Sequence, residues 1–391
     1  MKLSVNISKV TPPSLPPILY RPRLLDLLEK NKDKKLILIL GQAAQGKTTL
    51  AASYVKTSKS PSAWVNLEEE DSDPYTLFHN ILQSFQQVLK DIDFSHILSH
   101  PPGKMQTNTE VRLFRDWTQS LFGLISSPIQ IVLDGLDRFS PASPAFKFLQ
   151  ILVENAPPNI HPIMLSRETP PPSLKFQRLK IRQEAFILTN EELAFTPDEI
   201  REFFKQIRKI AFNADQLKKI CAATEGWVGG LILLSETLNR FPEDSRPKSI
   251  SEDLPDHFKG EIFQYFGREI FSGQPKQIQQ FLLQSSVFDL LEPGFMKDFT
   301  GAENSEEILQ GLAGRNLFVQ AIYDDQKGWL YRFHQLFRNF LRVKFDGFVK
   351  SPFCSIFVIP AKAGIQLIQV VLDSCFRRSD GFSDFLRDHQ I

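Results

Sequence analysis

Residues 36–48 read LILILGQAAQGKT and decide the fold class of the N-terminal part of the chain. A short apolar run that ends at a glycine is typical of a β-strand buried on both faces. Gly41, Gly46, Lys47 and Thr48 have the spacing of a P-loop, and the helix formers of KTTLAASYVKT follow. A strand, a glycine-containing loop and a helix in this order predict a phosphate-binding loop.

The residue types of this loop predict its chemistry. Backbone N–H groups and the helix N-terminus would form a concave anion site, with Lys47 bridging the β- and γ-phosphates and the Thr48 hydroxyl binding Mg²⁺. The predicted cofactors are therefore ATP or ADP and Mg²⁺, and the alternative is a glycine turn before an ordinary helix. The expected nucleotide contacts are Gly41, Gln42, Ala43, Ala44, Gln45, Gly46, Lys47, Thr48 and Thr49.

Four further apolar runs alternate with stretches of helical periodicity: SAWVNL, IQIVLD (129–134), HPIMLS (161–166) and AFILT (185–189). Alternating strands and helices favour a parallel sheet covered by helices. The sequence thus predicts an α/β P-loop NTPase domain with a parallel sheet over residues 26–190.

Charged residues follow two of these predicted strands. Asp134 ends the run IQIVLD, where its carboxylate would emerge beside the loop and help to hold Mg²⁺. Asp137 could orient the attacking water, or it could cap a helix or lie in a solvated turn. Arg167 follows the next strand and is either a γ-phosphate sensor or a surface arginine. Asp137 and Arg167 are the candidate catalytic residues.

The remainder of the chain predicts two smaller domains. Helical patterns fill 191–245, with Thr196 as an N-cap, and a segment rich in Pro, Ser and Asp predicts a linker at 246–256. Amphipathic helices and a hairpin that turns at Asp324 and Asp325 predict a winged-helix-like domain at 257–345. Residues 1–25 form an N-terminal arm, and 346–391 form an atypical tail.

Composition excludes several classes of protein. The chain of 391 residues has 46 Lys and Arg against 45 Asp and Glu, so no global charge attracts it to nucleic acid or to an anionic membrane. The three cysteines are too scattered for a disulfide framework. No apolar run of about 18 residues predicts a membrane span. We expect a cytoplasmic protein that does not enter a membrane.

Several segments, taken in order, resemble the large ATP-dependent transcriptional regulators of the LuxR family, of the maltose-activator type within the STAND class. The resemblance spans about residues 8–345. Its most specific segments are LTNEELAFTPDEIREFF, ATEGWVGGL and GWLYRFHQLFRNFL, and GQAAQGKTTL, VLDGLDRF and MLSRETPP precede them. The resemblance implies that the α/β domain is of the AAA+/STAND-like type and that nucleotide lies between it, a helical domain and a winged-helix domain. It also implies that ADP/ATP exchange opens or closes the assembly and that the ATP state can self-associate.

Further nucleotide contacts follow from the resemblance alone. It implies that Tyr20, Arg21 and Pro22 flank the adenine, that the turn Gly226–Gly229, with Val228, lies near it, and that His334 touches the β-phosphate of ADP. The alternatives are a surface arm for Tyr20–Pro22 and a core position for His334.

The sequence departs from the family pattern at two positions. Gly135 follows Asp134 where many relatives have a second acid, so the pattern argues for nucleotide binding more strongly than for hydrolysis. Val228 replaces a proline. Relatives also continue into a helical-repeat sensor and a helix-turn-helix domain, whereas 46 residues follow Phe345. Residues 356–366 and 371–382 look like translated intergenic repeats, so we expect a truncated chain; the alternative is an exposed peptide that docks on a partner.

The preferred function is an ATP/ADP-binding switch core with slow or absent hydrolysis and no DNA-binding output domain of its own. One alternative is a phosphotransferase or an active ATPase. Another is an interaction module whose winged helix binds DNA or protein through Arg332, Arg338, Arg342 and Lys344. Because these charges interleave with Phe333, Phe337, Phe340 and Leu341 at helical spacing, a solvated face beside a core face is favoured over direct DNA binding.

Overall fold

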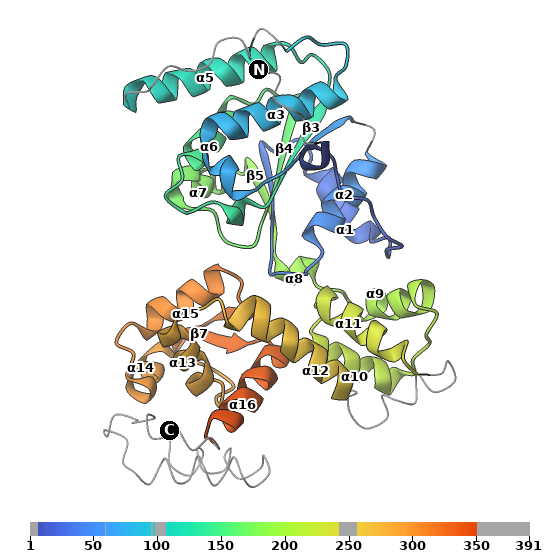
Figure 1. The fold of residues 1–391 in the computed structure, drawn as a ribbon, viewed down its shortest axis with the longest axis vertical. Helices are drawn as coiled ribbons and strands as arrows, with labels where there is room; N and C mark the ends of the chain where they lie inside the picture. Colours follow the sequence, from blue (N-terminus) through green and yellow to red (C-terminus); the bar gives the residue numbers. More distant parts are fainter. Residues whose placement is uncertain (1–6, 59, 95–96, 98–106, 242–255, 350–391) are drawn as a thin grey trace. The chain divides into compact units, whose positions relative to one another are not determined.

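The computed structural model describes residues 7–58, 60–94, 97, 107–241 and 256–349 (Figure 1). The chain divides into two compact units, Met1–Phe258 and Lys259–Ile391. The first unit therefore holds both the predicted NTPase domain and the predicted helical domain. The predicted linker at 246–256 and the tail at 346–391 fall almost entirely outside the described residues.

A five-stranded parallel sheet forms the centre of the first unit, with the strand order β2-β3-β4-β1-β5. The strands are β1 (Leu36–Leu40), β2 (Ser62–Asn66), β3 (Ile129–Asp134), β4 (Ile160–Ser166) and β5 (Ala185–Leu188). The strand β1 pairs in parallel with both β4 and β5, so it lies inside the sheet. The predicted α/β fold is confirmed, and each predicted strand is present within one residue or so of its expected bounds.

Helices cover both faces of the sheet, as the buried apolar runs of its strands require. Leu36 and Leu38 belong to the core cluster shared with α3, α5, α6 and α7, whereas Ile37 and Ile39 belong to the cluster shared with α1 and α2 (Figure 1). The covering helices are α1 (Pro22–Lys30), α2 (Lys47–Thr57), α3 (Pro74–Val88), α5 (Thr107–Gly123), α6 (Ala145–Asn155) and α7 (Phe176–Ile181). Short 3₁₀ turns occur at η1 (Ile7–Val10), η2 (Glu69–Ser72), η3 (Leu136–Arg138) and η4 (Pro172–Leu174).

The helical block of the first unit begins directly after β5. It comprises α8 (Asn190–Leu193), α9 (Pro197–Glu202), the π-helical segment η5 (Phe203–Ile207), α10 (Ala214–Thr224) and α11 (Val228–Leu238). Thr196 caps α9 as predicted, because its side chain accepts from the Glu199 N–H while the Glu199 carboxylate accepts from the Thr196 N–H. Leu193, Ile200 and Trp227 are buried in this block.

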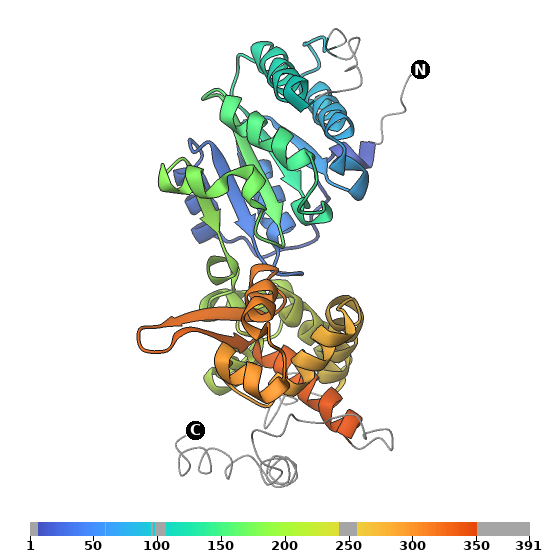
Figure 2. The same cartoon turned by 90° about the vertical axis from the view of Figure 1, so that its left-hand side faces the viewer.

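The second unit combines helices with one hairpin. Its elements are the remainder of α12 (Asp256–Tyr265), the π-helical η8 (Phe266–Phe271), α13 (Lys276–Ser285), α14 (Pro293–Thr300), α15 (Ser305–Gly314), β6 (Val319–Asp324), β7 (Gly328–Phe333) and α16 (Gln335–Val349). The hairpin projects from the helices of its own unit in Figure 2. Asp324 ends β6 and its carboxylate accepts from the N–H groups of Gln326 and Lys327, which confirms the predicted turn.

Among the described residues, no helix combines the length and the apolar character needed to cross a bilayer.

Candidate functional site

The loop between β1 and α2 leads into the N-terminus of a helix. Ala44 and Gly46 have positive φ angles of 55° and 85°, and Gly46 is the N-cap of α2. The N–H groups in the first turn of a helix have no partner within the helix. The sequence therefore places the N-terminus of α2 where it can receive an anion, as the P-loop motif predicts.

Lys47 lies within the loop rather than on the surface. Its Nζ donates to the carbonyl oxygens of Gly41 at 2.6 Å and of Gln42 at 3.0 Å. Burial lowers the pKa of Lys47 to about 8, although the nearby Asp137 carboxylate acts in the opposite direction. A buried ammonium held by neutral carbonyls gains a stronger partner when a phosphate arrives.

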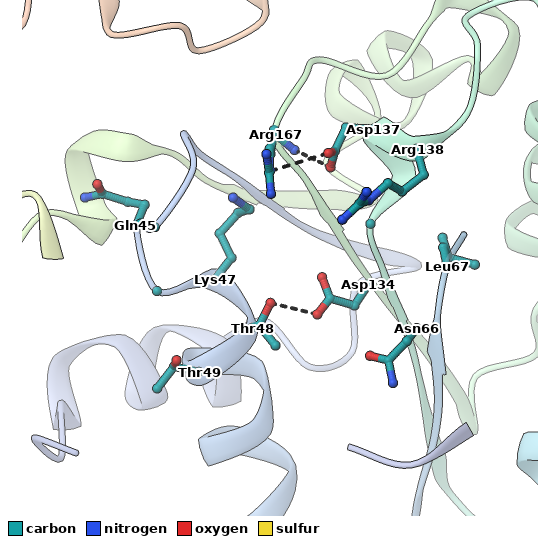
Figure 3. Close-up of a pocket in the computed structure, with 13 residues that line it drawn as sticks. Gln45, Lys47, Thr48, Thr49, Asn66, Leu67, Asp134, Asp137, Arg138 and Arg167 are labelled. Carbon is teal, nitrogen blue, oxygen red and sulfur yellow. Dashed lines mark hydrogen bonds and ion pairs between the residues drawn. The ribbon is translucent and has the colours of Figure 1, made fainter. Parts of the chain in front are cut away.

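Thr48 and Asp134 meet at the carboxyl end of the sheet. The Thr48 hydroxyl donates to Asp134 Oδ2 at 2.7 Å (Figure 3). Burial raises the pKa of Asp134 above its ordinary value, while the hydrogen bond from Thr48 and the charge of Lys47 oppose this shift. A hydroxyl and a carboxylate beside a phosphate loop fit Mg²⁺, which prefers oxygen ligands and keeps several waters. No group of three or more His, Cys, Asp and Glu that could hold a metal occurs in the part of the chain described.

Asp137 and Arg167 contact each other at the ends of adjacent strands. Asp137 Oδ1 accepts from the Arg167 backbone N–H at 2.8 Å, and Oδ2 lies 3.6 Å from Arg167 Nε (Figure 3). The preceding Gly135 has a φ of 107°, and a Cβ there would lie 3.3 Å from the Leu67 carbonyl oxygen. A second acid directly after Asp134 would therefore be strained, which accounts for its absence in VLDGLD.

These residues line a pocket of about 370 Å³, here called the phosphate pocket (Figure 3). Its lining comprises Ala44, Gln45, Gly46, Lys47, Thr48, Thr49, Asn66, Leu67, Asp134, Gly135, Asp137, Arg138 and Arg167. The structure thus brings Ala44–Thr49 of the predicted loop together with Asp134, Asp137 and Arg167. The other predicted loop contacts, Gly41, Gln42 and Ala43, are not part of this lining. Sequence reasoning missed Asn66, Leu67 and Arg138. Asn66 ends β2, so the rule that placed Asp134 at the carboxyl edge of the sheet also applies to it.

A second pocket of about 280 Å³, here called the apolar pocket, adjoins the first. The two pockets share Gly46 and Thr49. The remaining lining comes from the N-terminal arm, α1, α2 and the helical block: Pro16, Pro17, Ile18, Leu19, Tyr20, Arg21, Leu25, Leu50, Ser53, Phe195, Phe203, Ile207, Arg208, Val228 and Ile232. Of the residues expected beside the adenine, Tyr20, Arg21 and Val228 line this pocket. Pro22 does not line it but begins α1 next to them.

The helical block contacts the P-loop backbone directly. Trp227 Nε1 donates to the Ala43 carbonyl oxygen at 3.0 Å, and the Gly229 N–H donates to the Ala44 carbonyl oxygen at 2.9 Å. A Cβ at Gly229 would lie 2.9 Å from the Ala44 Cβ and closer still to the Trp227 ring, so only glycine permits this approach. Trp227 is therefore a buried core residue, and the turn that contains it supports the P-loop.

Arg21 joins the N-terminal arm to the helical block. Its guanidinium donates to the Glu199 carboxylate, at 2.8 Å from Nη2, and to the Leu193 and Ala194 carbonyl oxygens. It also stacks on the Phe195 ring at 4.2 Å. These contacts hold one wall of the apolar pocket in place.

His334 lies in the second unit, where its side chain is buried. Its backbone N–H donates to the Phe318 carbonyl oxygen at 2.9 Å, its Nδ1 accepts from the Leu336 N–H at 3.2 Å, and its ring packs edge-on against the Phe318 ring. These are contacts of a core residue within that unit. The nucleotide contact expected for His334 stays a prediction.

Comparisons with known proteins agree with this geometry. Residues 267–350 match the family model of the MalT winged helix domain, and residues 30–165 match that of an AAA domain. The HTH-type transcriptional regulator MalT of Vibrio cholerae is 25% identical over 339 residues, which cover 85% of this chain and 36% of that protein. MalT of Serratia proteamaculans is 27% identical over 334 residues, covering 82% and 34%. Over most of its length the chain is therefore similar to MalT regulators, and its AAA and winged-helix segments match the corresponding family models.

The MalT-like chain also shares its fold with a solved structure. A Walker-type ATPase of Pyrococcus abyssi superposes with a TM-score of 0.53 at 16% identity, covering 83% of this chain and 96% of that one. The MalT-like chain spans about a third of the length of the curated relatives it matches. The similarity therefore extends over the AAA and winged-helix parts of those regulators.

Proposed function

We propose that the first unit of this MalT-like chain binds ATP or ADP with Mg²⁺ and acts as the nucleotide-dependent switch core of a transcriptional regulator. The observation that carries the proposal is the junction of two chemically different pockets at Gly46 and Thr49. A polar pocket with loop N–H groups suits phosphates, and an adjoining apolar pocket suits a base. When bound, Mg²⁺ would neutralise phosphate charge between Thr48 and Asp134.

Nucleotide binding is coupled to the helical block through the walls of both pockets. The block supports the P-loop through Trp227 and Gly229, and it supplies Phe195 and Val228 to the apolar pocket. A ligand that binds one arrangement of these elements more tightly shifts the population toward that arrangement. We also propose that the ATP-bound state can self-associate, which the resemblance to STAND regulators implies.

Slow or absent hydrolysis is the second part of the proposal. Both carboxylate oxygens of Asp137 face Arg167, so Asp137 positions that arginine instead of presenting a free oxygen to water. An active ATPase or phosphotransferase is the competing function. Magnesium-dependent turnover above about 10⁻² s⁻¹ that is lost in Asp137→Asn would favour it.

The experiment that tests nucleotide binding is thermal unfolding with and without Mg-ADP. A ligand at 100 times its Kd stabilises the folded state by about 2.7 kcal/mol. Lys47→Ala should remove this stabilisation, whereas Lys56→Ala, at the exposed end of the same helix, should retain it. Equal melting temperatures of the natural protein with and without saturating Mg-ADP would contradict the proposal.

A winged helix that binds DNA directly is less well supported. Arg338 donates to the Ser286 and Val287 carbonyl oxygens and pairs with Asp289, and Arg342 also donates to the Val287 carbonyl oxygen. Arg332 donates to Gln320, and the Lys344 ammonium lies 5.1 Å from the centroid of the Phe271 ring. All four cations predicted to form a basic face thus have partners within their own unit. Salt-dependent binding to duplex DNA would revive this alternative.

A further inference from the structure

Arg138 is a cation of the phosphate pocket with no role in the site as described so far. It ends the 3₁₀ turn η3 after β3, and Figure 3 shows its guanidinium directed into the pocket. Within the described ranges of the chain, its side chain makes no hydrogen bond and no ion pair. The other two cations of the lining are engaged: Lys47 with loop carbonyl oxygens and Arg167 with Asp137.

The location of Arg138 fixes which part of a ligand it can meet. The apolar pocket joins the phosphate pocket at Gly46 and Thr49, whereas Arg138 and Arg167 line only the phosphate pocket. They follow β3 and β4, on the Asp134 side of that pocket. If the base of a nucleotide occupies the apolar pocket, its first phosphates would lie at the N-terminus of α2. Its terminal phosphate would then lie beside Arg138 and Arg167.

The charge balance of the lining agrees with this placement. Lys47, Arg138 and Arg167 oppose two carboxylates, those of Asp134 and Asp137. A γ-phosphate adds further negative charge at neutral pH, and a guanidinium can bind phosphate oxygens through two N–H groups at once. Arg138 lies near enough to Asp134 for its charge to favour the ionised carboxylate, but it makes no close ion pair with it, so its guanidinium is suited to that additional charge.

We propose that Arg138 binds the terminal phosphate of a nucleoside triphosphate, together with Arg167, and thereby makes the site distinguish triphosphate from diphosphate. The inference rests on the proposed function, because it requires a nucleotide in the phosphate pocket. In this arrangement Asp137 is a positioning residue that fixes the backbone and guanidinium of Arg167, while Arg138 is the group that gains its partner only in the triphosphate state.

The test compares Arg138→Gln with the natural protein by isothermal titration, using Mg-ADP and the magnesium complex of a non-hydrolysable ATP analogue with a β,γ-imido bridge. Loss of a charge-assisted hydrogen bond should weaken analogue binding about 10- to 100-fold. The affinity for Mg-ADP should change by less than about twofold. Arg178→Gln is the matched control, because Arg178 is also exposed but lines a separate pocket with Lys35 and Glu184, which precede β1 and β5.

The outcomes separate the inference from the function on which it rests. If the natural protein binds neither nucleotide, both fail. If Arg138→Gln binds both nucleotides like the natural protein, or loses affinity for both equally, nucleotide binding stands and the role of Arg138 is wrong. Should Arg138→Gln fail to fold, Arg138→Lys keeps the charge without the paired N–H groups and should still lose analogue affinity selectively. An unchanged affinity ratio in Arg138→Lys, with Arg138→Gln unfolded, would overturn the proposal.

Discussion

The phosphate pocket and the apolar pocket meet at Gly46 and Thr49, yet they are built in different ways. The carboxyl ends of β2, β3 and β4 and the segments that follow them build the phosphate pocket, together with the loop after β1 and the first turn of α2. The apolar pocket combines the arm, α1, α2 and the helical block, which lie far apart in the sequence. The comparison teaches that the polar half of the site depends on the sheet, whereas the apolar half depends on how the helical block packs on it.

The largest effect is expected where the helical block supports the loop. Trp227 is 1% exposed and donates to Ala43, so Trp227→Ala should lower the free energy of unfolding of the first unit by about 3–5 kcal/mol. Trp227→Phe, which removes mainly the hydrogen bond and part of the ring, should cost about 1–2 kcal/mol. Urea unfolding followed by circular dichroism measures both. Trp329→Ala, at a 50% exposed position, is the control. Equal losses of unfolding free energy in Trp227→Ala and Trp329→Ala would contradict the special role of the Trp227 contact.

The phosphate pocket should account for most of the binding energy. Lys47→Ala removes the cation that reaches the loop carbonyls and should weaken both Mg-ADP and a triphosphate analogue by about 100-fold or more. Isothermal titration measures both affinities. Lys56→Ala is the control variant and should bind both ligands like the natural protein. A Lys47→Ala protein that retains its affinity would show that the ligand lies elsewhere.

The apolar pocket should contribute less and only to the nucleoside. Val228→Asn places an amide against the base and should weaken Mg-ADP binding about tenfold, near 1.4 kcal/mol. The affinity for magnesium tripolyphosphate, which lacks a base, should stay within about twofold. A parallel loss for both ligands would mean that the two pockets do not divide the ligand as proposed.

The smallest effect concerns pH and the wall formed by Arg21. Burial alone would raise the pKa of Glu199, but hydrogen bonds from Arg21 and from the Thr196 N–H hold it below the ordinary value of 4.5. A carboxylate with a lowered pKa in the folded state contributes stability above about pH 4.5 and loses that contribution as the pH falls further. The natural protein should therefore melt about 2–4 °C above Glu199→Gln at pH 7.

That difference should shrink toward zero as the pH is lowered through 4. Differential scanning calorimetry at several pH values measures it, and Glu191→Gln, at an exposed position of α8, should show no such convergence. A difference between the natural protein and Glu199→Gln that does not depend on pH would contradict the assignment of the Arg21–Glu199 pair.

Much of the fold could be predicted from the sequence because its signals are local. LILIL, IQIVLD and KTTLAASYVKT became β1, β3 and α2 with their expected bounds, and the capping pattern at Thr196 marked the start of α9. The P-loop and Asp134 were found for a physical reason: binding phosphate and Mg²⁺ restricts residue type and spacing within a few positions. Such restrictions are visible in a single sequence.

The missed residues lack signals of this kind. Arg138 lies in the segment LDGLDRF without a motif of its own, and only the turn η3 after β3 directs its side chain into the pocket. The bond from Trp227 to Ala43 joins residues 184 positions apart, which no local pattern reports. The partnership of Asp137 with Arg167 depends on the neighbouring positions of β3 and β4, so the sequence suggested two separate roles where the structure shows one pair.

A crystal structure of the protein grown with magnesium and the β,γ-imido analogue of ATP tests the central claim most directly. The account predicts the phosphates against the N–H groups at the start of α2, Mg²⁺ beside Thr48 and Asp134, and the base between Tyr20, Arg21 and Val228. Analogue bound at another place, or saturating analogue with the Thr48–Asp134 hydrogen bond and the Lys47 contacts to the loop unchanged, would contradict it.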